Sequence, residues 1–509
     1  MRTLTLLAIC AGLTACASIK PELPLPLPDL LPPSALELLQ TQLSDDVRAG
    51  KLVSVSYALV QRGRIVHEAA VGWADQAQQR AATPHTPYPL ASLSKPLLAT
   101  AVVRLSEQGR LDLDAPARRY LPELPSDFTA SVRQLLMHSS GLPGYARICW
   151  RDQGHESRPD PASARPHAFA AQPPGRLFEY SNLGYGLLGQ IVSAQSGQPL
   201  DRHLQQQLFA PLGMQDSSLP ESYAPPEGAA HKYDSRGQQL PDTWNDTPGA
   251  GNLYASAHDL ARFAAFQLGD ADAAAQALLT PQNRQLMQQA AEPNAHYAYY
   301  GSARYGLGWY HRRSAQGEPL VWHEGGMPGA SSLLLMLPER HLAVVVLMNS
   351  NDGNARAQSI ANTLLRSVLP GYTAVSLDAS DGLQAYAGDA ALRGRWSGEI
   401  LVDGRPLRWA LRFDEHGDIS AEFPDRPADS GLPQQLRFNA LQSGPLLLAT
   451  LPVRLPASGV SQRGQTGYLL LRLWREGETL KGSATAYAAE DRLEHLLPFP
   501  AQLRREVSP

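Results

Sequence analysis

Hydrophobic residues along the 509-residue chain recur with two spacings, one typical of helices and one typical of strands. A spacing of three or four residues marks an amphipathic helix, whereas alternation or a short apolar run marks a strand. The pattern predicts helices over residues 34–48, 92–108 and 355–369, and strands over 52–60, 64–73, 306–311, 320–323, 331–337 and 342–347. Strands at both ends with helices between them predict an α/β domain over residues 34–370.

The pattern changes after residue 370. Residues 371–390 are predicted to be a linker. Residues 391–509 hold short alternating runs, such as 407–413, 446–451 and 468–474, with glycine turns between them. Helical periodicity is weak in this part, so we expect a second, all-β domain with an antiparallel barrel-like or sandwich arrangement.

The first residues read as a targeting segment. Arg2 precedes a short apolar run, and the segment that ends at Cys16 (LTAC) resembles the lipobox of bacterial lipoproteins. That resemblance implies a signal peptide over residues 1–15, lipidation of Cys16 and, because Ala17 follows, sorting to the outer membrane. The proline-rich residues 16–33 would then link the lipid anchor to the folded domain. An ordinary secretory signal is the alternative.

Composition narrows the classes of function. The formal net charge of −4, without a basic stripe, argues against a nucleic-acid partner. The chain has three cysteines, and only Cys149 would remain besides the anchor, so no disulfide framework is expected. The histidines show no metal-ligand spacing, and we expect no metal and no organic cofactor.

Lysine is rare in this chain, since only five of the 44 lysines and arginines are lysine. One of them is Lys95, in the segment ASLSKP that begins at Ala91. A desolvated lysine can give up its proton, whereas arginine keeps its charge. Ser92 lies three residues earlier at the predicted helix start, so the two side chains share a face and Lys95 could activate Ser92. The spacing alone also arises by chance.

Two further segments carry groups suited to acyl transfer. Tyr180 could take a proton from Ser92, because a tyrosine hydroxyl beside a cation loses its own proton more readily. Asn182 could hold a carbonyl group or Lys95, although such a tripeptide before a helix is also an ordinary cap. His323 precedes two glycines at a strand end, where a backbone N–H could complete an oxyanion hole.

In this order, the three segments resemble the motifs of the serine β-lactamase and penicillin-binding-protein superfamily, specifically its class C β-lactamase-like branch. S-x-x-K matches residues 92–95, Y-x-N matches 180–182 and H-x-G matches 323–325. Further family-like stretches lie at 135–143, 249–260 and 305–309, and the resemblance covers about residues 36–370. It implies an antiparallel sheet flanked by helices, with a helical subdomain.

The resemblance also implies roles for single residues. Ser92 is the implied acyl-forming nucleophile, and Lys95 and Tyr180 share the general-base and general-acid duty. The backbone amides of Ser92 and Gly326 would form the oxyanion hole. Contacts with a small ester or peptide substrate are implied for Asn182, His323, Gly325 and Gly326.

One departure from the family pattern bears on the substrate. β-Lactamases of this family usually carry lysine followed by a hydroxyl residue in the third motif, and here His323 and Glu324 stand there. A mostly neutral imidazole would hold a substrate carboxylate poorly, and Glu324 would repel it and attract a free amine. The alternative is that the Glu324 side chain points away into solvent. We therefore expect a lipid-anchored envelope hydrolase, facing the periplasm, that acts on small esters or peptides with a D-amino acid. The alternatives are a β-lactamase or DD-carboxypeptidase, and a non-enzymatic cell-wall or β-lactam sensor that acylates without turnover.

The start of the second domain has a weaker resemblance. Residues 392–398 (LRGRWSG) resemble the opening of lipocalin-like appended domains. A structural or cleft-covering module is the preferred interpretation, and ligand carriage is the alternative.

Overall fold

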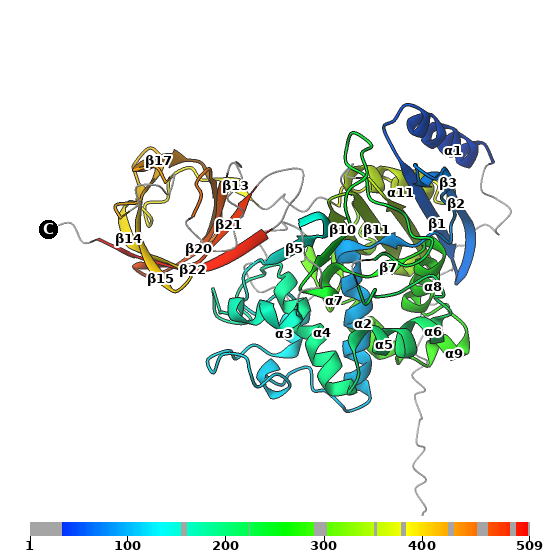
Figure 1. Ribbon diagram of the computed structural model, residues 1–509, viewed down its shortest axis with the longest axis horizontal. Helices are drawn as coiled ribbons and strands as arrows, with labels where there is room; N and C mark the ends of the chain where they lie inside the picture. Colours follow the sequence, from blue (N-terminus) through cyan, green and yellow to red (C-terminus); the bar gives the residue numbers. More distant parts are fainter. Residues whose placement is uncertain are drawn as a thin grey trace, which may run out of the picture.

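The computed structural model describes residues 33–153, 160–222, 224–289, 303–350, 354–377, 383–425, 432–455, 467–488 and 495–506. The predicted signal peptide, Cys16 and nearly all of the proline-rich linker lie outside these residues. Two antiparallel sheets organise the described chain, one in each half of the molecule (Figure 1). None of the helices in these ranges has the length and apolar character to cross a membrane.

The first half is built on an eight-stranded antiparallel sheet. The predicted N-terminal hairpin lies beside the predicted C-terminal strands. Its first strand, residues 54–61, pairs with the strand at residues 342–348. In spatial order the strands are β3 (Arg80–Ala81), β2 (Arg64–Asp75), β1 (Ser54–Gln61), β12 (Leu342–Met348), β11 (Ala330–Leu337), β10 (Pro319–Met327), β9 (Tyr310–Arg313) and β8 (Arg304–Tyr305).

Helices cover both faces of this sheet, as Figure 1 shows. One face packs against α1 (Pro33–Arg48) and α11 (Asn354–Val368), with Val344 and Val346 in that core. The opposite face packs against the helical region, with Val345 in its core. Successive side chains of each buried strand point to opposite faces of the sheet, so they enter the two cores in turn. The strands are therefore nearly continuous apolar runs in the sequence.

The helical region lies between the two parts of the sheet in sequence, as the helical periodicity predicted. It follows a short 3-10 turn, Ala91–Leu93 (η2), that leads directly into the first of its helices. The helices are α2 (Ser94–Glu107), α3 (Val132–Leu136), α4 (Asn182–Ser196), α5 (Leu200–Leu204), α6 (Ala210–Leu212), α7 (Pro248–Gly251), α8 (Ala257–Leu268), α9 (Ala273–Gln276) and α10 (Pro281–Met287). Short strand pairs also occur here: β4 (Tyr88–Pro89) with β7 (Tyr254–Ala255), and β5 (Ala146–Trp150) with β6 (Thr243–Asn245).

Two strands differ from the sequence prediction for local reasons. The predicted strand 320–323 continues to Met327, because the ladder to β11 carries on through two glycines that have no side chain to show alternation. The predicted strand 306–311 is split into β8 and β9. A tight turn separates them, in which Gly308 has a φ of +91° and the Gly306 N–H donates to the Trp309 carbonyl over 2.8 Å.

The second half is a curled antiparallel sheet, a half-barrel, as the alternating runs predicted. Its interior is apolar and includes Trp396, Trp409 and Leu471. In spatial order the strands are β13 (Gln384–Ala385), β18 (Ala440–Ser443), β19 (Leu446–Leu451), β20 (Gly467–Glu476), β21 (Thr479–Ala488), β22 (His495–Arg505), β14 (Gly394–Val402), β15 (Arg405–Phe413), β16 (Ile419–Glu422) and β17 (Gln435–Phe438). The short β13 falls within the segment that the sequence analysis assigned to a linker.

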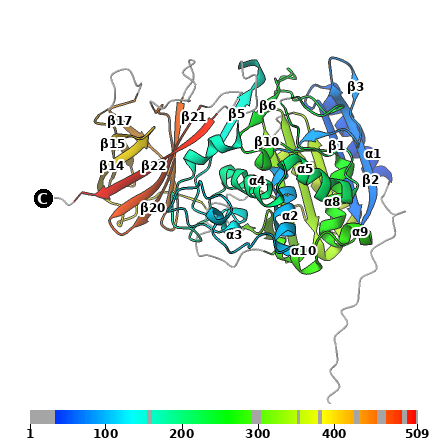
Figure 2. The same cartoon turned by 60° about the horizontal axis from the view of Figure 1, so that its bottom comes forward.

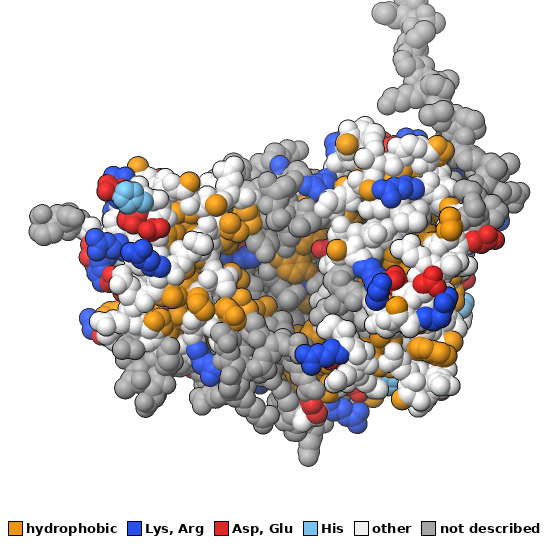
Figure 3. Space-filling model, turned by 90° about the horizontal axis from the view of Figure 1, so that it is seen from above, with side chains coloured by type: hydrophobic (Ala, Val, Ile, Leu, Met, Phe, Trp, Pro, Cys, Tyr) orange, Lys and Arg blue, Asp and Glu red, His pale blue; other side chains and the backbone are white. Residues whose placement is uncertain are grey.

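The two halves are connected by strand pairing. Strand β22 pairs with β5, which pairs in turn with β6, so the half-barrel sheet continues into the first half (Figure 2). Periodicity did not predict β5, since a strand of five residues leaves little pattern in the sequence. On the face seen in Figure 3, basic and acidic side chains are interspersed over both halves.

Candidate active site

Ser92 lies in the 3-10 turn η2, immediately before α2. The residue before it, Ala91, has a φ of +46°, a left-handed conformation that is unfavourable for a residue with a side chain. The side chain of Ala91 is buried, and that of Ser92 is partly exposed. The Ser92 side chain is therefore accessible to solvent, although the residues on either side of it are buried. Pro96 lies in the first turn of α2, where its missing N–H is tolerated.

Lys95 is fully buried and makes three polar contacts. Its Nζ lies 2.9 Å from Ser92 Oγ, 2.8 Å from Asn182 Oδ1 and 2.9 Å from the Ala250 carbonyl oxygen. Burial lowers the pKa of Lys95 well below its usual value. The Asn182 and Ala250 oxygens can only accept hydrogen bonds. A neutral amine that donates to both of them directs its lone pair at the Ser92 hydroxyl, which is the arrangement needed to remove a proton.

The second motif lies at the start of α4, beside Lys95. The Lys95 Nζ is 4.7 Å from the centre of the Tyr180 ring. Ser181 caps α4 by accepting the Gly184 N–H over 3.2 Å. Asn182 turns its amide oxygen to Lys95, so its NH₂ group is left to donate elsewhere. The structure thus brings Ser92, Lys95, Tyr180 and Asn182 together.

His138 supports this turn. Its Nδ1 accepts the Ser181 backbone N–H over 3.0 Å, and its ring lies 4.3 Å from the Tyr180 ring between centroids. The ring is buried, which lowers the pKa of His138 well below its usual value. His138 therefore acts as a neutral acceptor that holds the backbone between Tyr180 and Asn182.

The third motif runs along β10 against the turn that bears Ser92. A Cβ atom at Gly325 would lie 2.1 Å from the Leu90 carbonyl oxygen and 2.9 Å from Leu93 N. Only glycine permits this approach of strand and turn. Gly326, the next residue, is exposed, and a Cβ atom there would make only ordinary van der Waals contact with the Asn354 side chain, at 3.8 Å. Its backbone is therefore accessible beside the Ser92 turn.

His323 is fully buried beneath the site, and both of its ring nitrogens have partners. Its Nδ1 lies 2.7 Å from the Glu324 carbonyl oxygen and its Nε2 lies 2.9 Å from Tyr305 Oη. A carbonyl can only accept, so Nδ1 carries the proton and Nε2 accepts from the tyrosine. Burial, with a smaller contribution from Lys95, lowers the pKa of His323 to about 3. His323 is therefore neutral and packs among aromatic rings in tilted and edge-on contacts, although its predicted role is contact with substrate.

The half-barrel touches the segment that leads into the second motif. Arg472 of β20 lies 3.6 Å from Glu179, the residue before Tyr180, and both side chains are largely buried. Burial raises the pKa of Glu179, while Arg472 opposes that shift. Trp474 Nε1 donates to the Ala171 carbonyl oxygen over 3.2 Å. The sequence alone does not point to Arg472, because a charged residue in an alternating strand normally faces solvent.

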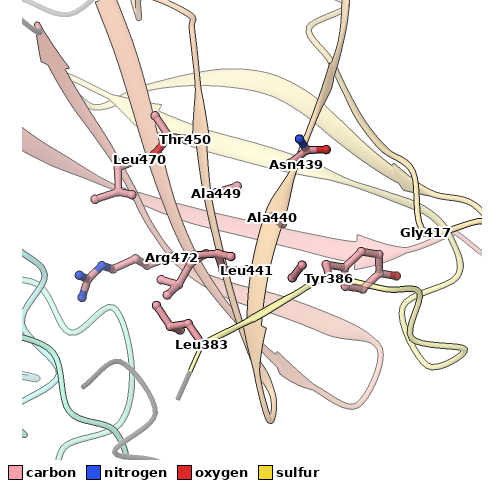
Figure 4. Close-up of a pocket in the computed structure, with 12 residues that line it drawn as sticks. Leu383, Tyr386, Gly417, Asn439, Ala440, Leu441, Ala449, Thr450, Leu470 and Arg472 are labelled. Carbon is pink, nitrogen blue, oxygen red and sulfur yellow. The ribbon is translucent and has the colours of Figure 1, made fainter. Parts of the chain in front are cut away.

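Arg472 also borders the cavity in Figure 4. This cavity has a volume of about 700 Å³ and lies at β13, β18, β19 and β20 of the half-barrel, with apolar walls from Leu383, Leu448 and Leu470. Figure 4 shows the guanidinium of Arg472 directed away from the barrel strands. Ser92, Lys95 and Tyr180 are not among the residues that line it.

Comparison with known proteins identifies the class. The family model described as Beta-lactamase matches residues 39–367. The chain belongs to the beta-lactamase family, whose members are serine hydrolases. This match and the observed fold confirm the superfamily and the α/β architecture that the three motifs predicted.

Individual relatives show how far the likeness extends. Protein flp of Staphylococcus aureus (strain NCTC 8325 / PS 47) is 27% identical over 329 residues, which cover 62% of this chain and 63% of that protein. The chain thus spans less than two thirds of that relative's length. A crystal structure of SurE covers 93% of this chain and 99% of its own, with 23% identity and a TM-score of 0.62. The D-amino acid amidase from Ochrobactrum anthropi SV3, complexed with D-phenylalanine, covers 66% of this chain and 99% of its own, with 25% identity and a TM-score of 0.55.

Proposed function

We propose that the protein is a serine hydrolase that forms an acyl-enzyme on Ser92 and acts on small esters or on amides and peptides with a D-amino acid. The observation that carries the proposal is the buried contact of Lys95 Nζ with Ser92 Oγ at 2.9 Å and with Asn182 Oδ1 at 2.8 Å. A serine needs a neighbouring base to become a nucleophile at neutral pH, and a desolvated lysine is such a base.

The proton path follows from these positions. Ser92 Oγ attacks the substrate carbonyl carbon while its proton passes to Lys95 or, through it, to Tyr180. The backbone N–H groups of Ser92 and Gly326 are the proposed donors to the oxyanion. The same proton then goes to the leaving alcohol or amine, and water releases the acyl group by the reverse sequence. The Asn182 NH₂ group is placed to hold a substrate carbonyl.

The third motif supports the choice of substrate. The neutral, fully buried His323 supplies no positive charge for a substrate carboxylate. The adjacent Glu324 side chain would repel a carboxylate and attract an amine. Both features favour uncharged esters or substrates with a free amine over β-lactams. The likeness to a D-amino acid amidase supports the same class.

The test follows nitrophenol release from a short-chain nitrophenyl ester and ammonia release from D-phenylalaninamide. Wild type should turn over many times, and Ser92→Ala should lose all turnover. Ser44→Ala is the matched control, because Ser44 lies on α1 and its hydroxyl donates only to the Gln40 carbonyl. A single burst without turnover would instead support the sensor, and faster hydrolysis of nitrocefin than of the ester would support the β-lactamase. Turnover that survives in Ser92→Ala would overturn the assignment of the nucleophile.

The cellular setting is a proposal from the sequence. The segment ending at Cys16 supports a lipid anchor that holds the hydrolase at the bacterial envelope, facing the periplasm and attached to the outer membrane. Metabolic labelling with palmitate should mark the wild type and should not mark Cys16→Ser. Equal labelling of both would contradict the anchor.

A further inference from the structure

A cluster of two histidines and a glutamate lies on the helical side of the eight-stranded sheet, apart from the candidate active site. Glu68 comes from β2, His85 from the segment that leads into β4, and His258 from the first turn of α8. One nitrogen or oxygen atom from each side chain lies within 4.8 Å of the other two. The side chains are 28%, 57% and 26% exposed, respectively, so an ion from solvent can reach them.

The distances suit a divalent transition metal. His258 Nδ1 lies 3.0 Å from Glu68 Oε2, and the two imidazole rings are 4.4 Å apart between centroids. Nitrogen and carboxylate ligands lie about 2.0–2.2 Å from Zn²⁺, which places neighbouring ligand atoms roughly 3.3 Å apart in a tetrahedral site. Glu68 and His258 already have nearly that separation. The His85 ligand atom lies within 4.8 Å of the other two, and its side chain is half-exposed, so it has room to close on an ion.

A carboxylate behind His85 completes the arrangement. His85 Nδ1 lies 2.9 Å from Asp216 Oδ2, which leaves Nε2 to coordinate. The Asp216 carboxylate is itself held by the Ser256 hydroxyl over 2.9 Å. Histidines that bind metals usually donate their other ring N–H to a carboxylate, which fixes the tautomer and orientation of the ring.

The backbone around the cluster is tied together. The His258 N–H donates to the Pro84 carbonyl oxygen over 3.1 Å, so the segments that carry the two histidines are linked. Ser256 caps α8 by accepting the Asp259 N–H over 3.1 Å. His85 and Asp216 also line a cavity of about 550 Å³, so solvent reaches the His85 side of the cluster. A fourth ligand position can therefore be taken by water.

We propose that Glu68, His85 and His258 bind one Zn²⁺ ion, with Asp216 as the partner that orients His85. The ion would fasten β2, the segment before β4 and the start of α8 to one another. Two nitrogen ligands and one carboxylate, with water in the fourth position, are a ligand set that zinc accepts. Sequence spacing concealed the site, because its three ligands come from separate elements of the chain.

The test uses Co²⁺ as a spectroscopic probe and Zn²⁺ as the competing ion, with purified full-length chain that carries no histidine tag. Wild type should bind about one Co²⁺ with the visible absorption bands of a four-coordinate nitrogen and oxygen site, and Zn²⁺ should abolish the bands. His85→Ala/His258→Ala should show no bands. Asp216→Asn should weaken binding by about 10- to 100-fold, as expected for the loss of an orienting partner.

His341→Ala is the matched control. His341 is half-exposed and pairs with a carboxylate, Asp270, over 2.8 Å, so the variant removes an ordinary histidine–carboxylate pair. It should bind Co²⁺ as wild type does. Addition of Zn²⁺ should raise the midpoint of thermal unfolding of wild type and His341→Ala alike, and should leave the folded double variant unchanged. Bands of equal intensity in the double variant, or no bands in wild type, would overturn the proposal.

Discussion

The two halves of the molecule differ in what they bury. The first half buries ionisable groups around its candidate site, including Lys95, His138 and His323. In the described residues of the half-barrel, the buried polar side chains are Ser420, Ser483 and Thr485, none of them charged. The rest of that interior is apolar and includes the largest side chains, such as Trp396 and Trp409. Both sheets are antiparallel, but the side chains that they bury differ in chemical character.

This difference indicates where stability and chemistry reside. A buried charge is costly unless it is hydrogen-bonded, so a fold retains such groups where they serve a purpose. Substitution of the buried ionisable groups should therefore change the reaction more than the stability. Substitution in the half-barrel core should do the opposite, and the contact between Arg472 and Glu179 should connect the two halves.

The largest effect on rate should come from Lys95→Met. Loss of the proton acceptor beside Ser92 should lower kcat for ester hydrolysis by about 10²- to 10⁴-fold. The free energy of unfolding should change little, because methionine fills the space and removes a buried amine. Steady-state kinetics and urea unfolding measure both. Lys51→Met is the control, since Lys51 is 68% exposed, and a similar loss of rate there would contradict the role of Lys95.

The converse test is Trp409→Ala in the half-barrel. The Trp409 side chain is 1% exposed, and its removal leaves a cavity that should lower the free energy of unfolding by about 3–5 kcal/mol. Initial rates per folded molecule, measured well below the unfolding midpoint, should stay near those of wild type. A rate loss comparable to that of Lys95→Met would show that the two cores are not functionally separate.

Arg472→Met tests the contact between the halves. Without Arg472, the Glu179 carboxylate keeps its hydrogen bonds from Gly144 and Gln172 but loses its cation. It should then shift the backbone before Tyr180, and a shift of about 1 Å near a reacting group lowers kcat by up to 10²-fold. We expect a decrease in kcat of about 10- to 100-fold with a smaller change in KM. The double variant Arg472→Met/Glu179→Gln should recover most of it, because glutamine leaves no unpaired charge.

The matched control for this contact is Glu476→Gln. Glu476 pairs with Arg176 across the same boundary, but its side chain is 50% exposed, so its loss should change stability by less than about 1 kcal/mol and leave kcat unchanged. An equal loss of kcat in both variants would assign the effect to docking of the halves and not to Glu179.

The last prediction concerns stability against pH. Burial lowers the pKa of His311 from 6.5 to about 3 in the folded protein, so the folded state binds fewer protons than the unfolded state between these values. The stability due to the neutral ring is present above pH 6.5 and is lost as the pH falls towards 3. The slope is about 1.4 kcal/mol per pH unit for one proton. Urea unfolding of His311→Gln at pH 7 and pH 4.5 should show a correspondingly weaker pH dependence, and an unchanged dependence would contradict the lowered pKa.

The sequence predicted the local parts of this architecture well. Helical spacing placed Ser92 and Lys95 on one face, and the structure has their polar atoms 2.9 Å apart. The main strands of the first sheet and the runs of the half-barrel also lie where alternation predicted them, because side-chain periodicity follows burial on a sheet face.

The parts that the sequence did not predict depend on contacts between distant segments. The Ala250 carbonyl reaches Lys95 from α7, and Arg472 reaches Glu179 from the half-barrel. The buried orientation of His323 depends on Tyr305 and on the path of β10. Periodicity reports whether a residue is buried, but it does not report which partner a buried polar atom finds.

The most direct test of the central claim is the intact mass of the protein after brief reaction with a slow nitrophenyl ester, followed by peptide mapping. Wild type should gain one acyl group, located on Ser92, and the adduct should decay with the release of acid. Lys95→Met should acylate far more slowly, and Ser92→Ala should gain nothing. An adduct on another residue, or equal acylation of Ser92→Ala, would contradict the account.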